Sequence, residues 1–238
     1  MLYETPNPHG GDLYSREILL DFSANINPYG TPQAVKEAVA ASVENLRCYP
    51  DPYCRKLISA IADFEQVPAK QVFCGNGAAE LMFSCCMALR LRKAMVLSPC
   101  FSEYETALKV FGTETAHYLL RREDDFALTE AFLPTLERFD GEMLMLCNPN
   151  NPTGQVIERP LMEKILEICR RRSIFLFIDE CFLDLTQGGE TFSMKPFLEG
   201  TENLFLLKAF TKSYGMAGLR LGYCLCGNAK LLRTMGRQ

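Results

Sequence analysis

Short, almost wholly apolar runs alternate along this chain with longer segments in which apolar and polar residues recur at helical spacing. Runs of the first kind are typical of buried strands, because a strand covered on both faces needs apolar side chains at consecutive positions. We predict strands within residues 72–75, 93–98, 113–120, 142–147, 173–179, 203–210 and 219–226.

The intervening segments predict amphipathic helices, because apolar side chains spaced three or four residues apart share one helix face. We expect Thr31 to cap the first helix with Pro32 at its first position, and Pro160 to lie in the first turn of a later helix. The predicted helical segments are 31–46, 52–66, 78–91, 101–112, 129–139 and 158–172.

This alternation favours an α/β fold of three layers, with a mostly parallel sheet between two layers of helices. Ligands of such folds bind beyond the carboxyl ends of the strands. Four polar residues lie at or just beyond the ends of predicted strands, namely Asn76, Asn151, Asp179 and Lys212. We expect them to meet at one edge of the sheet, a convergence that indicates a functional site.

Composition is that of an ordinary globular protein: of 238 residues, 48% are hydrophobic and 23% charged. The net charge of −4 is too mild to indicate a nucleic-acid or anionic-membrane partner. No apolar run reaches the roughly 20 residues of a membrane-spanning helix. The first residues, MLYETPNPHGGD, do not have the pattern of a signal peptide.

The eleven cysteines are spaced irregularly within apolar segments. This distribution predicts reduced, buried thiols in a cytoplasmic protein rather than a disulfide framework. With only two histidines in the chain, we do not expect a metal site.

Lys212 and Asp179 are the two residues best suited to chemistry. Lys212 lies in the segment TKSYGMAGLRLGY, among small neighbours, and Arg220 follows eight residues later. A lysine held in a partly desolvated position can form a Schiff base, and a nearby arginine can hold an anion, as pyridoxal phosphate requires. A carboxylate ending a buried strand needs a cation or donors, so Asp179 could face a protonated pyridine. It could equally cap the turn that follows.

Three further segments could contribute to the same site. The loop NPNNPTG (148–154) offers the Asn151 amide on a rigid turn, although an ordinary Asn-Pro turn would have the same sequence. The glycine turn GNGAAEL (75–81) opens a helix whose first N–H groups favour a phosphate, or it is simply a tight connection. Phe101 could stack on a cofactor ring or belong to the core.

Taken in order, the glycine turn, PCF, NPTG, DE, TK and GLRLGY resemble the fold-type I pyridoxal-phosphate enzymes of the aspartate aminotransferase superfamily. The resemblance runs through essentially the whole chain and implies the large domain of that fold. It also implies pyridoxal 5'-phosphate as the cofactor. It implies that Lys212 forms the Schiff base and that Asp179 meets the pyridine nitrogen.

The resemblance implies roles for the remaining residues as well. Asn151 meets the phenolic oxygen of the cofactor and Phe101 stacks on its ring. The phosphate is held by backbone groups of Gly77 and Ala78 and by the side chains of Thr211 and Arg220. Tyr49 matches a tyrosine that reaches the cofactor phosphate of a partner subunit, which implies a homodimer.

Within the superfamily, the segments HGGD (9–12), DFSANINPYG (21–30) and YPDP (49–52) resemble threonine-phosphate decarboxylases, and so does Phe182. The implied reaction is decarboxylation of L-threonine O-3-phosphate in cobalamin biosynthesis, with a small phosphorylated amino acid as substrate. Histidinol-phosphate aminotransferases share the later motifs and are the alternative. Neutral drift would also explain Phe182.

The resemblance divides the chain into an N-terminal arm, residues 1–30, and a cofactor-binding large domain, residues 31–238. Enzymes of this superfamily continue into a C-terminal small domain, which we expect this chain to lack. A non-catalytic protein that binds pyridoxal phosphate is therefore a further alternative.

Overall fold

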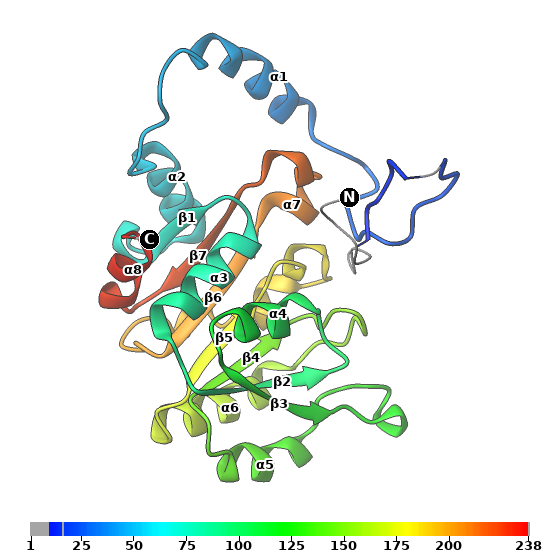
Figure 1. Ribbon diagram of the computed structural model, residues 1–238, viewed down its shortest axis with the longest axis vertical. Coiled ribbons are helices and arrows are strands. Elements are labelled where there is room, and N and C mark those ends of the chain that lie inside the picture. The colour runs from blue at the N-terminus through cyan, green and yellow to red at the C-terminus, as the bar shows by residue number, and fades with distance from the viewer. Residues whose placement is uncertain (1–9, 16, 238) are drawn as a thin grey trace.

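The computed structural model describes residues 10–15 and 17–237, which fold around one seven-stranded sheet with helices on both faces (Figure 1). The strands lie in the order β1-β7-β6-β5-β4-β2-β3. Their bounds are β1 Val72–Gly75, β2 Lys93–Ser98, β3 Glu114–Leu119, β4 Met143–Cys147, β5 Phe175–Asp179, β6 Leu204–Ala209 and β7 Gly222–Cys226. Every predicted strand is present, and the α/β prediction is confirmed.

The sheet is mostly parallel, as predicted. Only β7 runs against its neighbours, between β1 and β6, and the other strands all point the same way. The carboxyl ends of β1, β2, β4, β5 and β6 therefore meet at one edge of the sheet. The loops that carry the candidate residues leave the sheet at that edge.

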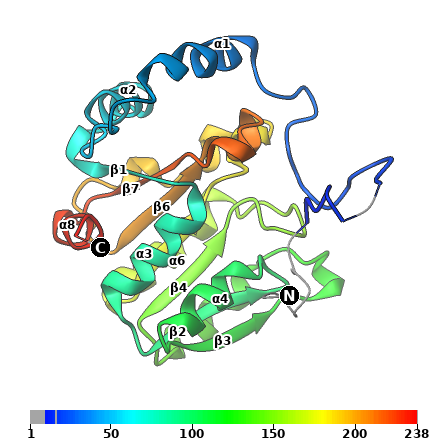
Figure 2. The same cartoon turned by 45° about the horizontal axis from the view of Figure 1, so that its top comes forward.

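Helices cover the sheet in two layers (Figure 2). Helices α3 Ala78–Leu89, α4 Glu103–Val110 and α8 Ala229–Met235 lie on one face, and α2 Arg55–Glu65, α5 Leu133–Arg138 and α6 Arg159–Arg171 lie on the other. Because successive side chains of a strand point to opposite faces, β4 contributes Met143 and Met145 to the first core and Leu144 and Leu146 to the second. Helix α8 is the one α-helix of this set that the sequence pattern did not predict.

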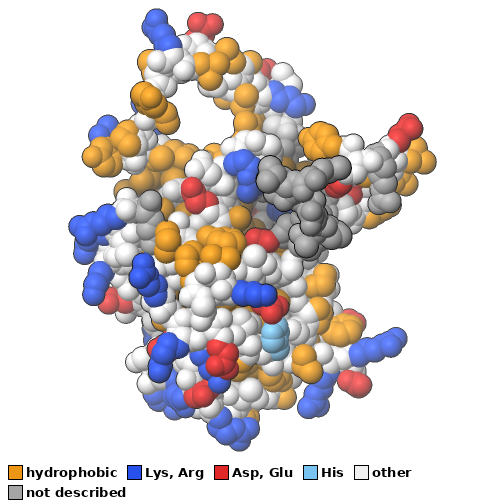
Figure 3. Space-filling view, viewed as in Figure 1, with side chains coloured by type: hydrophobic (Ala, Val, Ile, Leu, Met, Phe, Trp, Pro, Cys, Tyr) orange, Lys and Arg blue, Asp and Glu red, His pale blue; other side chains and the backbone are white. Residues whose placement is uncertain are grey.

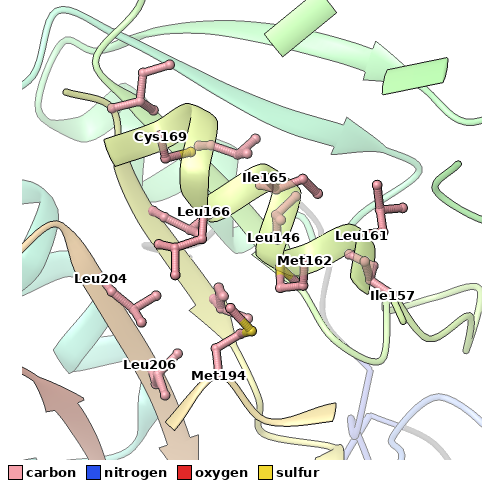
Figure 4. Packing of buried hydrophobic residues seen from close by; sticks show 14 of the residues in the cluster. Leu146, Ile157, Leu161, Met162, Ile165, Leu166, Cys169, Met194, Leu204 and Leu206 are labelled. Carbon is pink, nitrogen blue, oxygen red and sulfur yellow. The ribbon is translucent and has the colours of Figure 1, made fainter. Parts of the chain in front are cut away.

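The apolar residues that predicted helix α6 are the ones that pack into the core beneath it (Figure 4). Leu161, Met162, Ile165 and Leu166 come from one side of the helix and lie buried against the sheet. Pro160 stands in the first turn, as predicted, where its missing N–H costs nothing.

Helix α1, Gln33–Ser42, stands apart from these layers and has no buried residue. It arches over the rest of the molecule, and the space-filling view shows open space beneath it (Figure 3). The predicted cap was wrong: Pro32 occupies the N-cap position, and the Thr31 hydroxyl donates instead to the carbonyl of Gly215 at 2.7 Å. The Thr31 hydroxyl therefore bonds to a residue distant in the sequence and not to the first turn of α1.

Candidate active site

A cavity of about 160 Å³ opens at the carboxyl edge of the sheet, on the face covered by α3 and α4. Eight residues singled out from the sequence line it: Ala78, Phe101, Asn151, Asp179, Phe182, Thr211, Lys212 and Arg220. Three of the lining segments follow strands β2, β4 and β6, whereas Asp179 ends β5, Ala78 starts α3 and Arg220 lies just before β7. The structure therefore brings together residues that are far apart in the sequence.

Asp179 and Glu180 are neighbours in sequence that serve opposite faces of the sheet. Asp179 ends β5 on the cavity face, where its Oδ1 accepts from the N–H of Cys181 at 2.9 Å. Glu180 points to the other face and accepts from the Ser193 hydroxyl at 2.8 Å and the N–H of Met194 at 2.9 Å. The alternation of a strand makes only Asp179 available to a ligand.

Tyr104 is a site residue that sequence reasoning undervalued. It lies in α4, fully buried, and its hydroxyl donates to Oδ2 of Asp179 at 2.8 Å. Its ring meets that of Phe101 edge-on, with centroids 5.6 Å apart. Burial, together with the Asp179 charge, holds the pKa of this phenol well above its ordinary value, so it remains a donor. A tyrosine at an apolar helix position gave no signal of this role.

Lys212 lies in α7, Phe210–Ser213, a helix of only four residues beyond the end of β6. Burial lowers the pKa of its amine, and the nearby Arg220 charge lowers it further. The amine lies 5.5 Å from the centroid of the Phe182 ring, on the cavity wall. A lowered pKa makes the neutral, nucleophilic form of the amine more available.

Lys208 is excluded as a rival to Lys212 by its place in β6. Its side chain turns to the opposite face of the sheet, where Nζ lies 3.1 Å from Oε1 of Glu65. Lys195 pairs with the same carboxylate at 2.8 Å. Both amines are engaged in a buried ionic cluster away from the cavity.

The loop after β4 holds three asparagines with different environments. Asn148 accepts from the N–H of Ile157 at 2.8 Å and donates to its carbonyl at 3.2 Å. Asn150 donates to the carbonyl of Pro99 at 3.2 Å and to the Thr153 hydroxyl at 3.0 Å. These two buried amides secure the loop and tie it to the segment that carries Phe101, while Asn151 lines the cavity.

The turn before α3 brings backbone N–H groups to the same edge. Gly77 has a φ of +89°, and a Cβ added there would stand 2.7 Å from Nη2 of Arg220, so the guanidinium lies directly against this turn. A Cβ at Gly222 would stand 2.9 Å from the Gly77 carbonyl carbon. Asn76 lies in this turn too, but its side chain bonds to Glu80 rather than facing the cavity.

A wider cavity of about 740 Å³ adjoins the first and shares Phe101, Asn151 and Lys212 with it. Its other wall is the N-terminal segment, including Ser23 and Asn25. Tyr49 belongs to neither cavity: it is fully exposed in the loop between α1 and α2. Of the HGGD segment, His9 falls outside the described residues.

Thiols line the floor of the inner cavity. Cys147 and Cys181 are buried there, and burial holds both pKa values above the ordinary value. All eleven cysteines lie in the described part of the chain and each is free; seven are buried, as predicted, whereas Cys48 is exposed and Cys54, Cys74 and Cys100 are half-buried. Residues 10–15 and 17–237 contain no cluster of three metal-ligating side chains and no helix that could cross a membrane.

The lining matches the chemical groups of pyridoxal phosphate. A partly desolvated amine suits its aldehyde, and a buried carboxylate suits its pyridine nitrogen. The N-terminus of α3, with Arg220 beside it, suits its phosphate. Asp179 Oδ1 accepts from the N–H of Cys181 and Oδ2 from the Tyr104 hydroxyl, and a carboxylate has further lone pairs for an additional donor.

Comparison with known proteins defines the class to which this site belongs. Residues 17–238 match the family described as aminotransferase class I and II. The chain belongs to that family of pyridoxal-phosphate-dependent enzymes.

Two curated relatives are similar in sequence to this chain over most of its length. The threonine-phosphate decarboxylase of Salmonella typhimurium is 39% identical over 97% of this chain and 65% of its own length. The histidinol-phosphate aminotransferase of Caldanaerobacter subterraneus is 32% identical over 89% of this chain and 59% of its own length. The chain thus spans less than two thirds of the length of each.

Among solved structures, the histidinol-phosphate aminotransferase of Clostridium acetobutylicum superposes with a TM-score of 0.83 at 27% identity. The match covers 92% of this chain and 64% of that protein. It confirms the expectation that the sheet and its helices form the large-domain fold of these enzymes.

Proposed function

We propose that this chain binds pyridoxal phosphate through Lys212 and Asp179 and belongs to a threonine-phosphate decarboxylase. The observation that carries the proposal is the convergence of Lys212, Asp179 and the α3 N-terminus on one cavity. Each of the three matches a different part of the cofactor. The nearest rival amine, Lys208, is committed to Glu65 on the other face.

Lys212 would hold the carbonyl carbon of the cofactor covalently and move protons near it. Asp179, oriented by Tyr104, would accept a hydrogen bond from the pyridine nitrogen and keep that nitrogen protonated. Asn151 would donate to the phenolic oxygen, and Phe101 would stack on the ring. Asp179 and Lys212 are thus the residues that would act in catalysis.

The phosphate would lie at the start of α3. Backbone N–H groups of Gly77 and Ala78 would donate to it, and the helix dipole favours a negative charge there. Thr211 lines the cavity beside Lys212, and Arg220 lies against Gly77. These four residues would fix the cofactor at the end opposite Asp179.

The proposed substrate is L-threonine O-3-phosphate, which would lose its carboxylate as CO₂ and gain a proton at the alpha carbon. The bound cofactor supplies an electron sink for the pair left by the broken bond. The protein would decide which bond breaks by the orientation in which it holds the substrate against the cofactor. The outer cavity, beside Lys212 and Asn25, is where the substrate would be oriented.

Two observations support decarboxylation. The decarboxylase relative is 39% identical, against 32% for the aminotransferase relative. Phe182, which fits the decarboxylase pattern, lines the cavity and offers an apolar ring where a tyrosine would offer a hydroxyl. Histidinol-phosphate aminotransfer is the second candidate, because the solved aminotransferase of that specificity superposes well.

We further propose that residues 31–238 are the cofactor-binding large domain, with residues 1–30 as an arm, and that the chain forms a homodimer. Tyr49 would then reach the cofactor phosphate of the partner subunit. Free thiols at every cysteine agree with a cytoplasmic location. A non-catalytic cofactor binder is the alternative if parts of the active site lie outside this chain.

The first test is of cofactor attachment. Purified chain is mixed with pyridoxal phosphate, reduced with borohydride and digested, and the labelled peptide is identified by mass spectrometry. We expect the label on Lys212 and its loss in Lys212→Ala, with Lys230→Ala, at an exposed lysine of α8, as the control. Label on another lysine in the wild-type protein would refute the site.

The second test is of the reaction. The loaded protein is incubated with L-threonine phosphate and assayed for CO₂, and separately with histidinol phosphate and 2-oxoglutarate and assayed for glutamate. We expect CO₂ only. Glutamate without CO₂ would favour the aminotransferase, and neither product from a protein labelled at Lys212 would favour the non-catalytic binder.

A further inference from the structure

The helix that carries Lys212 cannot hold its shape alone. Helix α7 has four residues, far below the length at which an isolated helix is stable. Within the segment, Tyr214 donates to Phe210 at 3.2 Å and Gly215 donates to the Lys212 carbonyl at 3.3 Å. The position of the Lys212 amine therefore depends on contacts from elsewhere in the chain.

Asp184 accepts from the Ser213 hydroxyl at 3.1 Å, and the Leu221 carbonyl accepts from the N–H of Phe210 at 3.3 Å. Further contacts come from residues 27–31, which we term the N-terminal clamp. The backbone N–H of Asn27 donates to the Lys212 carbonyl at 3.1 Å, and its Nδ2 donates to the Ser213 carbonyl at 2.8 Å. The Thr31 hydroxyl donates to the Gly215 carbonyl at 2.7 Å. Three successive donors of the clamp thus satisfy carbonyls at the C-terminal end of the lysine turn.

The clamp is held by internal hydrogen bonds and packs closely against the lysine segment. Asn27 Oδ1 accepts from the N–H of Tyr29 at 3.0 Å, and the Asn27 carbonyl accepts from the N–H of Gly30 at 2.9 Å. A Cβ added to Gly215 would stand 2.9 Å from the Gly30 carbonyl carbon, so the two backbones touch. Asn27 and Thr31, the two residues whose side chains donate to the lysine segment, are half-buried, whereas residues 28–30 between them are exposed.

The same segment forms a wall of the outer cavity. Ala24, Asn25 and Ile26 line that cavity, and Asn27 follows them directly. One continuous stretch of backbone therefore joins the wall of the cavity to the carbonyl of Lys212. Displacing either part would displace the other.

We propose that Asn27, assisted by Thr31, is a positioning residue that fixes the Lys212 amine relative to the cavity and couples it to the N-terminal wall. The inference rests on the proposed role of Lys212 as the cofactor-binding lysine. Asn27 itself does not contact reacting atoms. Its effect is transmitted through the Lys212 and Ser213 carbonyls.

The test compares Asn27→Ala with Asn203→Ala. Asn203 is a matched control, because its Nδ2 also donates to one backbone carbonyl, that of Ile174, at 2.7 Å, but at the opposite end of β6 from Lys212. Thr31→Val, which keeps the side-chain shape and removes the donor, is the second variant. Reactivity of Lys212 toward acetic anhydride is followed against pH in the cofactor-free protein by mass spectrometry.

We expect Asn27→Ala to raise the pH midpoint of Lys212 labelling toward that of exposed lysines, because a loosened turn lets water reach the amine. The dissociation constant for pyridoxal phosphate should increase about fivefold, as expected for one lost hydrogen bond. Thr31→Val should shift both values in the same direction by less. Asn203→Ala should leave both unchanged.

The proposal is overturned if Asn27→Ala, or Thr31→Val should the first variant not fold, has the wild-type midpoint and dissociation constant. It is also overturned if Asn203→Ala shifts them equally, since the effect would then be general loosening. Failure of the proposed function is a separate outcome, in which wild-type protein would not retain pyridoxal phosphate on Lys212. The pH dependence of Lys212 acetylation would still show whether the clamp fixes the amine.

Discussion

At the scale of the residue, identical side chains a few positions apart have different environments because of the direction in which each one points. Lys208 and Lys212 are four residues apart, yet one is locked to Glu65 and the other lines the cavity. Asn150 and Asn151 are adjacent, yet the first secures the loop and the second faces the ligand space. The residue type is the same within each pair, so only the direction of each side chain distinguishes its members.

Tyr104 gives a prediction at this scale. Tyr104→Phe leaves Oδ2 of Asp179 without its buried donor, so the free energy of unfolding of the cofactor-free protein should fall by about 1–3 kcal/mol. Urea unfolding with linear extrapolation measures it. Tyr118→Phe, on a ring packed against Phe132 on the opposite face, is the control and should change stability less. Equal losses in both variants would contradict the assignment.

At the scale of the element, the active-site edge depends on a close approach between β7 and the start of α3. Gly222→Ala would place a Cβ 2.9 Å from the Gly77 carbonyl carbon and 3.0 Å from the N of Ala78, and neither backbone atom can move cheaply. We expect a loss of about 1–3 kcal/mol in unfolding free energy and weaker binding of pyridoxal phosphate. Thermal unfolding and a binding titration measure the two effects.

Gly218→Ala is the matched control for that substitution. A Cβ at Gly218 would have no heavy atom within 4 Å, so both stability and cofactor binding should stay near wild-type values. If Gly222→Ala binds the cofactor as tightly as Gly218→Ala does, the close approach does not support the phosphate end of the site.

The buried ionic cluster joins elements that are distant in sequence. Glu65 of α2 is 1% exposed and pairs with Lys208 of β6 and Lys195, and the Tyr223 hydroxyl of β7 donates to it. Glu65→Gln leaves Lys208 without this buried counter-charge. The expected cost is about 3–5 kcal/mol in unfolding free energy. Glu130→Gln, in an exposed pair with Lys164, should cost no more than about 1 kcal/mol.

The cost of Glu65→Gln should depend on pH. Burial raises the pKa of Glu65, but the charges of Lys208 and Lys195 outweigh it and hold that pKa below its ordinary value of 4.5. The contribution of a carboxylate with a lowered pKa is present above the ordinary value and is lost as the pH falls through the lowered one. Urea unfolding should therefore show wild type and variant converging below pH 4.5, and a constant difference would contradict this account.

At the scale of the whole molecule, the arch formed by α1 and the loop that follows it is a conspicuously exposed feature (Figure 1). Helix α1 buries no side chain, and Leu46 and Tyr49 in the following turns are almost wholly exposed. Exposed apolar residues in such a group are typical of an interface. This arrangement agrees with the proposed homodimer, in which Tyr49 would serve the partner subunit.

Complementation between subunits tests that proposal. Lys212→Ala and Tyr49→Phe chains should each bind pyridoxal phosphate poorly. In a mixed dimer, one site would combine an intact Lys212 with an intact Tyr49 from the other chain. Co-expression with two different tags, followed by purification on both, should therefore restore normal affinity in about half the sites. No restoration, with a dimer present, would show that Tyr49 does not act across subunits.

Much of the fold followed from the sequence, and particular elements show why. Residues 143–147 (MLMLC) and 175–178 (FLFI) are apolar at every position, as a strand covered on both faces requires, and both runs lie in central parallel strands. Helix α6 was predicted with its proline because its apolar face and first turn are local patterns. Helix α8 was missed, although Asn228 caps it, because so short a helix has too little periodicity to detect.

By itself the sequence determined the composition of the sheet, the strand ends at which polar groups would appear, and the residue types of the cavity lining. Those features depend on neighbours in the chain. Only the tertiary structure decided that Tyr104 donates a hydrogen bond to Asp179 and that the turn before α3 packs against Gly222. It also decided that Thr31 donates to the lysine segment instead of capping α1. Each is a contact between distant segments, which exists only once the sheet has brought their backbones together.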